Sequence, residues 1–136
     1  MQKNFPLFLL LLSLYYLLGC ANQGQLSGGK KDTRPPAVDT LKSTPNYQTN
    51  FKKQTIKLVF DEWVQLKDVF NQVVVSPPLQ EKFNVSLKKK TVSFKFNENE
   101  VLRENATYTI NFGDCVQDLT ERNPAQDLRF VFLVLP

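Results

Sequence analysis

Apolar and polar residues alternate along most of the chain, and this alternation predicts a series of short β-strands. Side chains of one parity are apolar in six segments: Ile56, Leu58 and Phe60; Val73 and Val75; Phe83, Val85 and Leu87; Val92, Phe94 and Phe96; Tyr108, Ile110 and Phe112; and Phe130, Phe132 and Val134. A period of two places each set on one face of a sheet. These side chains are therefore the expected core.

The segments between the predicted strands carry turn signals. Pro77-Pro78 stops one strand, and residues 41–50 are predicted to form a loop after a first edge strand at residues 37–41. No segment sustains a 3.6-residue period, and residues 64–70 favour at most one turn of helix. Short strands separated by turns are typical of an antiparallel β-sandwich, so we expect an all-β fold.

The start of the chain has a different character. Lys3 precedes an apolar run over residues 5–18, which is shorter than the about 20 residues that span a bilayer. A basic start and a short apolar stretch are typical of an export signal. The motif Leu17-Leu18-Gly19-Cys20 resembles a bacterial lipobox. That resemblance implies a signal peptide at residues 1–19, cleavage between Gly19 and Cys20 and a lipid on Cys20, with an uncleaved membrane helix as the alternative.

After the signal, residues 20–34 are predicted to be a flexible tether and residues 35–136 a single domain. The tether contains one large apolar side chain, Leu26, and reaches roughly 20 Å by coil scaling. The net charge of +4 is scattered, except for the run Lys88-Lys89-Lys90. This run favours a solvated hairpin tip over a patch for an acidic ligand. The excess of positive charge is small and the chain starts with an export signal, and both features argue against a nucleic-acid partner.

The residue types exclude two kinds of nucleophilic site. The chain has no histidine, so neither a Cys-His pair nor a Ser-His-Asp triad can form. If Cys20 carries a lipid, Cys115 has no partner within the chain, and we expect it to be a small core residue. We predict that the protein is not an enzyme, and the sequence indicates neither a cofactor nor a small-molecule substrate.

Other candidate residues have a structural and a functional interpretation. Asp61-Glu62 favours a turn, because adjacent residues on an extended chain point to opposite faces. Asp114, Asp118 and Glu121 carry oxygen donors that suit calcium, but they lack the known loop register, so a structural loop is expected and metal binding is the alternative. Trp63 and Phe70 flank Leu66, and such an aromatic residue either contacts a glycan or partner or, as large aromatics more often do, plugs the end of the sandwich.

Several separated motifs resemble one family. The stretches at residues 28–36, 60–68, 75–79 and 105–113 are similar, in order, to an envelope lipoprotein group common in Bacteroidota. Members of that group carry a bacterial Ig-like domain of the S-layer-protein type directly after the lipobox. The resemblance implies an immunoglobulin-like sandwich of about seven strands without catalytic residues. Family members usually continue well beyond this domain, so a chain ending at Pro136 is expected to be a truncated fragment or a stand-alone domain.

Together these features predict a lipid-anchored, non-catalytic envelope protein whose domain is a structural or protein-interaction module. Val131, Leu133 and Leu135 are expected to be exposed on the last strand and to form its best contact, with Trp63 as a second. The expected partners are the membrane, through the lipid, and other envelope proteins. A surface module that binds glycan or calcium is the alternative. Because no acidic residue follows Cys20 directly, we expect the periplasmic face of the outer membrane.

Overall fold

The computed structural model describes residues 28–136. The chain divides into two units, and the second, Lys31–Pro136, contains every strand described below. The predicted signal peptide, its cleavage site at Gly19 and Cys20, and the lipidation site at Cys20 lie outside the described residues. Within residues 28–136 no helix is long and apolar enough to cross a membrane.

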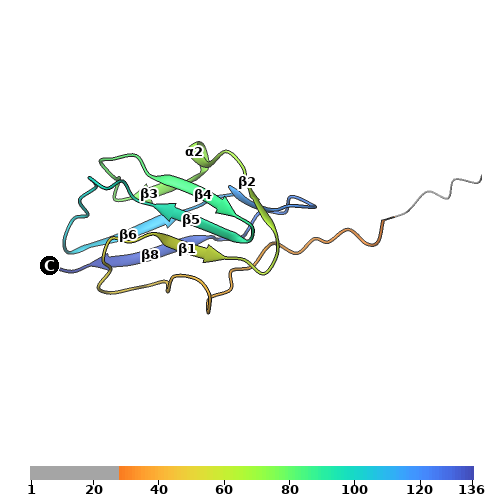
Figure 1. The fold of residues 1–136 in the computed structure, drawn as a ribbon, viewed down its shortest axis with the longest axis horizontal. Coiled ribbons are helices and arrows are strands. Elements are labelled where there is room, and N and C mark those ends of the chain that lie inside the picture. The colour runs from red at the N-terminus through yellow and green to blue at the C-terminus, as the bar shows by residue number, and fades with distance from the viewer. Residues whose placement is uncertain (1–27) are drawn as a thin grey trace, which may run out of the picture. The chain divides into compact units, whose positions relative to one another are not determined.

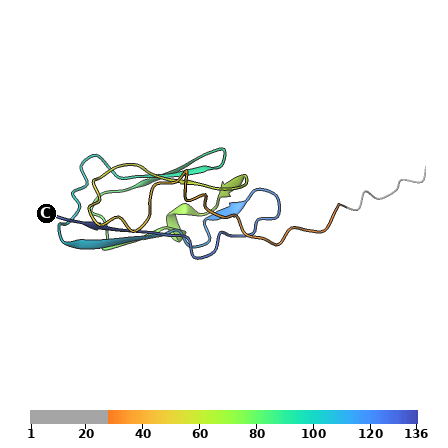
Figure 2. The same ribbon diagram turned by 90° about the horizontal axis from the view of Figure 1, so that it is seen from below.

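The second unit is an antiparallel β-sandwich (Figure 1). Its elements are β1 (Ile56–Val59), β2 (Val64–Leu66), α2 (Val69–Gln72), β3 (Val74–Ser76), β4 (Asn84–Lys88), β5 (Thr91–Lys95), β6 (Ala106–Asn111), β7 (Val116–Asp118) and β8 (Arg129–Val134). One sheet has the order β1-β5-β4 and the other β3-β6-β8, while β2 and β7 form a separate ribbon. Figure 2 shows the two sheets as separate layers. The predicted all-β fold is confirmed.

Apolar side chains at alternate positions of the strands fill the space between the two sheets. In β1 and β5 the buried positions are every second residue, and β6 and β8 bury their own alternate set. The fully buried large side chains are mostly aromatic: Tyr108, Phe51, Phe60, Phe94, Phe112, Phe130 and Phe132. Because burial of apolar area is the main favourable term in folding, this aromatic layer is the principal source of stability.

The segment before β1 is more ordered than the sequence indicated. Gln48 forms an isolated bridge with Phe132, and the backbone N–H of Tyr47 donates to the carbonyl oxygen of Val131 at 2.8 Å. Leu133 both donates to Gln48 and accepts from Phe51. Residues 46–51 therefore cover the outer edge of β8. Part of the predicted loop therefore pairs with β8 as a short strand would, because its backbone forms hydrogen bonds with residues that lie far away in the sequence.

Two further expectations are corrected. The first edge strand predicted at residues 37–41 is reduced to one bridge between Val38 and Phe60, supported by a hydrogen bond from Asp39 to Val59. The helical turn predicted at residues 64–70 begins later, as α2, because Val64–Leu66 pairs with β7 instead. Tertiary pairing outweighs local preference in both places.

Candidate functional site

Trp63 and Leu119 form an exposed apolar pair at the β2–β7 end of the sandwich. Val64 lies opposite Asp118 in the ribbon, and the backbone N–H of Leu119 donates to the carbonyl oxygen of Trp63 at 3.0 Å. Both side chains are about half exposed, at 52% for Trp63 and 53% for Leu119. The expectation that Trp63 plugs the sandwich end is therefore wrong, and its side chain is available for contact.

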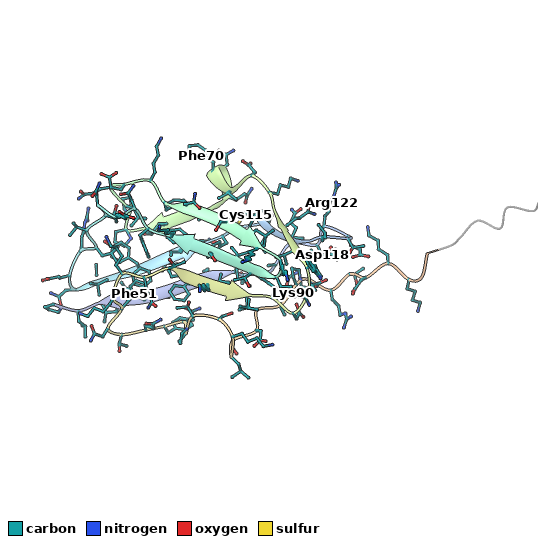
Figure 3. The ribbon with its side chains drawn as sticks, viewed as in Figure 1. Phe51, Phe70, Lys90, Cys115, Asp118 and Arg122 are labelled. Carbon is teal, nitrogen blue, oxygen red and sulfur yellow. The ribbon has the colours of Figure 1, made fainter. Side chains whose placement is uncertain are left out.

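Asp118 beside this pair organises its own loop. Its Oδ1 accepts the backbone N–H groups of Glu121 and Arg122 at 2.6 and 2.8 Å, and its Oδ2 accepts that of Asn123 at 3.0 Å. Figure 3 shows Asp118 and Arg122 at this end of the sandwich. Burial opposes ionisation of Asp118, but hydrogen bonds from Arg122, Asn123 and their neighbours outweigh it and hold the pKa below its usual value of 3.8.

The calcium alternative finds little support around Asp118. Its carboxylate oxygens are occupied by backbone donors, as in a turn cap. Asp114 is exposed and Glu121 is partly buried, and within residues 28–136 no group of three acidic, histidine or cysteine side chains could hold a metal ion. Asp118 thus has the loop role that the sequence favoured.

Asp61 has the hydrogen-bonding role that the sequence predicted. Its Oδ1 accepts the backbone N–H of Ala37 at 2.9 Å, and its carbonyl oxygen accepts the ammonium group of Lys90. Burial, together with the nearby charges of Asp61 and Asp118, raises the pKa of Glu62 above its usual value. The two adjacent carboxylates thus differ in environment, and Asp61 is committed to holding the chain turn.

An apolar groove that the sequence did not reveal lies along β3. It has a volume of about 570 Å³ and is lined mainly by Val69, Phe70, Val74, Leu79 and Phe83. Phe70 is 89% exposed and Val74 58% exposed, and Figure 3 shows Phe70 on α2, outside the two sheets. β3 is the last strand of its sheet. The uninterrupted Val73-Val74-Val75 run was the one sequence signal, since it places apolar residues on both faces.

The last strand does not offer the exposed surface that we expected. Val131 and Leu133 are partly buried beside residues 46–51, and only Leu135, at 38%, remains exposed. The hydrogen bonds from Tyr47 and to Gln48 occupy the edge of β8. A contact through Val131 and Leu133 would require this cover to move.

Cys115 is a core residue, as predicted. Its side chain is fully buried and has no disulfide partner among residues 28–136. Burial raises the pKa of its thiol to about 11. Since the thiolate is the reactive form, this sulfur is chemically inert in the folded state.

Tyr108 carries a feature typical of immunoglobulin-like sandwiches. Its buried phenol oxygen accepts the backbone N–H of Arg103, five residues upstream, at 3.0 Å. Such a tyrosine corner recurs in domains of this architecture. A comparison with protein families agrees with this immunoglobulin-like architecture, because residues 32–133 match the bacterial Ig-like domain. The chain belongs to this family. Searches of curated proteins and of solved structures found no match.

Membership of this family indicates the general kind of role to expect of the domain. Bacterial Ig-like domains are typically non-catalytic and serve as structural or interaction modules. Two exposed apolar surfaces of the described residues are candidates for contact, namely the β3 groove with Phe70 and the Trp63–Leu119 pair. Each presents apolar side chains to water at the rim of the sandwich.

Proposed function

We propose that this protein is a lipid-anchored, non-catalytic interaction module of the bacterial cell envelope, and that its bacterial Ig-like domain binds another envelope protein through the β3 groove. The observation that carries the interaction role is the exposure of Phe70. This ring is 89% exposed directly beside an apolar groove. Covering an aromatic ring and the groove under it removes apolar area from water and favours association.

The groove favours side-chain packing over strand addition. β3 has three residues and is followed by Pro77 and Pro78, which have no backbone N–H to donate. An added strand would therefore gain few backbone hydrogen bonds. The partner that fits is a protein segment with an apolar side chain that fills the space between Phe70, Leu79 and Phe83.

The anchoring part of the proposal rests on the sequence. The lipobox-like motif ending at Cys20 supplies the only residue type that can form a thioether to a lipid, and residues 20–34 supply the tether. Two or three acyl chains hold a protein firmly to a membrane, because each buried methylene adds about 0.8 kcal/mol. We place the protein at the outer membrane, on its periplasmic face.

Photocrosslinking in living cells tests the interaction. A photoreactive phenylalanine analogue at Phe70 should give one discrete adduct, the same partner should be captured from Val74, and Val74→Lys should abolish the Phe70 adduct. Tyr47 is the matched control, because it is also an exposed aromatic residue, at 72%, but lies beside β8. An identical set of adducts from Tyr47 and Phe70, or none from Phe70, contradicts the proposed interface.

Glycan binding at Trp63 is the second candidate function, and the half-exposed indole beside Leu119 favours it. An accessible aromatic face is the usual platform for a sugar ring. Trp63 is the one tryptophan of the chain, so its fluorescence reports this site directly. If the protein binds glycans here, titration with envelope oligosaccharides should change the fluorescence of Trp63 in a saturable way, and Leu119→Ala should weaken the binding. Fluorescence that does not change during the titration would rule out glycan binding at Trp63.

A further inference from the structure

The outer face of the sheet β1-β5-β4 carries lysines and small polar residues. Its outward positions are the exposed or partly exposed members of each alternating strand: Lys57 and Val59 on β1, Thr91, Ser93 and Lys95 on β5, and Asn84, Ser86 and Lys88 on β4. Lys89, at the tip of the β4–β5 hairpin, adds a fourth exposed ammonium group. We call Lys57, Lys88, Lys89 and Lys95 the lysine face.

The acidic residue placed near this face is Glu98, which lines the same depression as Lys95 but forms no ion pair with it. None of the three strands contains Asp or Glu. The ion pairs found within residues 28–136 are Arg34–Asp32, Lys42–Asp39 and Arg129–Asp127, so the lysine face has no carboxylate within 4.0 Å. The neighbouring Lys90 differs, because its ammonium group is bound to the carbonyl oxygen of Asp61. The four ammonium groups are therefore free to meet an external anion.

The four lysines are spread over a surface. Lys57 lies opposite Ser93, and Ser93 lies opposite Ser86, so this row crosses all three strands. Lys95 is diagonal to Lys57 at about 7–8 Å between Cα atoms. Lys88 lies two strands away from Lys57 and two residues along, which corresponds to about 12 Å. Such a two-dimensional array fits a plane of anions better than a single acidic chain.

We propose that the lysine face docks on an anionic membrane surface, where the ammonium groups lie against lipid phosphates. The hydroxyl groups of Ser86, Thr91 and Ser93 between the lysines supply additional hydrogen-bond donors to phosphate oxygens. The strand register places Lys57, Lys88 and Lys95 on the same side of the sheet, so these three ammonium groups can approach the headgroup plane together. The proposal rests on the proposed function in one respect, namely that anchoring brings the domain to a membrane. In this orientation the β3 rim, at the edge of the sandwich, stays accessible to a protein partner.

Cosedimentation with vesicles tests the proposal without any lipid anchor. The unlipidated domain of residues 31–136 serves here, because that unit contains the whole described core. It should bind vesicles that contain phosphatidylglycerol, not vesicles of phosphatidylcholine alone. Each lysine near an anionic surface contributes about fivefold in partitioning, so Lys57→Gln/Lys88→Gln/Lys95→Gln should lower binding about a hundredfold. Raising the salt from about 0.05 to about 0.5 M should have a similar effect.

A matched variant separates the lysine face from net charge. Lys67→Gln/Arg103→Gln/Arg122→Gln removes the same three charges from exposed positions outside the face. This variant should retain most of the binding, and circular dichroism should show that both variants are folded. Equal losses in the two variants, no binding of the unaltered domain to anionic vesicles, or binding only to a soluble acidic polysaccharide would overturn the proposal. Because the domain in this assay has no lipid, these outcomes are independent of whether Cys20 is acylated.

Discussion

The ring of Phe51 lies 4.0 Å from the ring of Phe132, centroid to centroid, although one residue precedes β1 and the other lies in the centre of β8. Phe51 also approaches Phe96 and Phe130 at 6.1 and 6.3 Å. Its backbone N–H donates to the carbonyl oxygen of Leu133 at 2.9 Å. This one residue therefore fixes residues 46–51 along β8 and joins both sheets through a cluster of aromatic rings.

Replacing Phe51 should be among the most destabilising changes in the domain. Phe51→Ala leaves a cavity among three aromatic rings, and we expect a loss of about 3–5 kcal/mol in the free energy of unfolding. Urea denaturation followed by circular dichroism measures it. Tyr47→Ala, at an exposed aromatic residue of the same segment, should change stability by less than about 1 kcal/mol. Equal losses for both variants would show that residues 46–51 act by backbone pairing alone.

Removing the charge of Asp118 should loosen the loop after β7. Asp118→Asn keeps one acceptor oxygen but replaces the other by an NH2 donor, so at least one of the three backbone N–H groups loses its acceptor and the others lose the charge of theirs, with an expected loss of about 1–3 kcal/mol at pH 7. The exposed Asp114→Asn is the control and should stay within about 0.5 kcal/mol of the unaltered protein. Chemical denaturation of the three proteins side by side provides the comparison.

The effect of Asp118→Asn on stability should depend on pH. The pKa of Asp118 is lower in the folded state than its usual value of 3.8, so the unfolded chain binds the proton more readily. The stabilisation by Asp118 is therefore complete above that value and is lost as the pH falls through the folded pKa. The stability difference between the unaltered protein and Asp118→Asn should shrink between about pH 5 and about pH 2. A difference that is constant over this range would contradict the ionised cap.

The hydroxyl group of Tyr108 should contribute to stability separately from its ring. Tyr108→Phe keeps the stacking on Phe132, at 5.3 Å, but leaves the backbone N–H of Arg103 without its acceptor. We expect a loss of about 1 kcal/mol. Tyr47→Phe removes an exposed hydroxyl and should be neutral. If the two variants are equally stable, the tyrosine corner does not hold this connection in place.

The thiol of Cys115 should react only after unfolding. With a pKa of about 11 and a fully buried side chain, it presents almost no accessible thiolate near neutral pH. In the domain of residues 31–136, where Cys115 is the single cysteine, a chromogenic thiol reagent should react at least about a hundredfold faster in guanidinium chloride than in buffer. Rapid stoichiometric reaction in buffer would show that the sandwich opens at β7.

The sequence predicted the parts of the fold that follow from local alternation. The strict two-residue period of Thr91–Lys95 and Ala106–Asn111 identified both strands and their buried faces. It could not predict that residues 46–51 cover β8, because that pairing joins segments more than eighty residues apart and leaves no periodic pattern. The exposure of Val131 and Leu133 was misjudged for this reason.

The candidate site was less accessible to sequence reasoning. An aspartate that caps a loop and one that binds calcium are the same residue type, and only the positions of the backbone donors around Asp118 distinguish them. For Trp63 and Phe70 the sequence raised an exposed contact only as the alternative, because aromatic residues are more often buried, and the structure shows both side chains exposed. The lysine run at residues 88–90 did predict a hairpin tip, and β4 and β5 confirm it.

Metabolic labelling with radioactive palmitate tests the central claim, that a lipid on Cys20 fastens this module to the envelope. The unaltered protein should incorporate label and fractionate with membranes, whereas Cys20→Ala should incorporate none while an immunoblot shows comparable amounts of both polypeptides. Equal labelling of the two proteins, or no labelling of the unaltered one, would contradict the account.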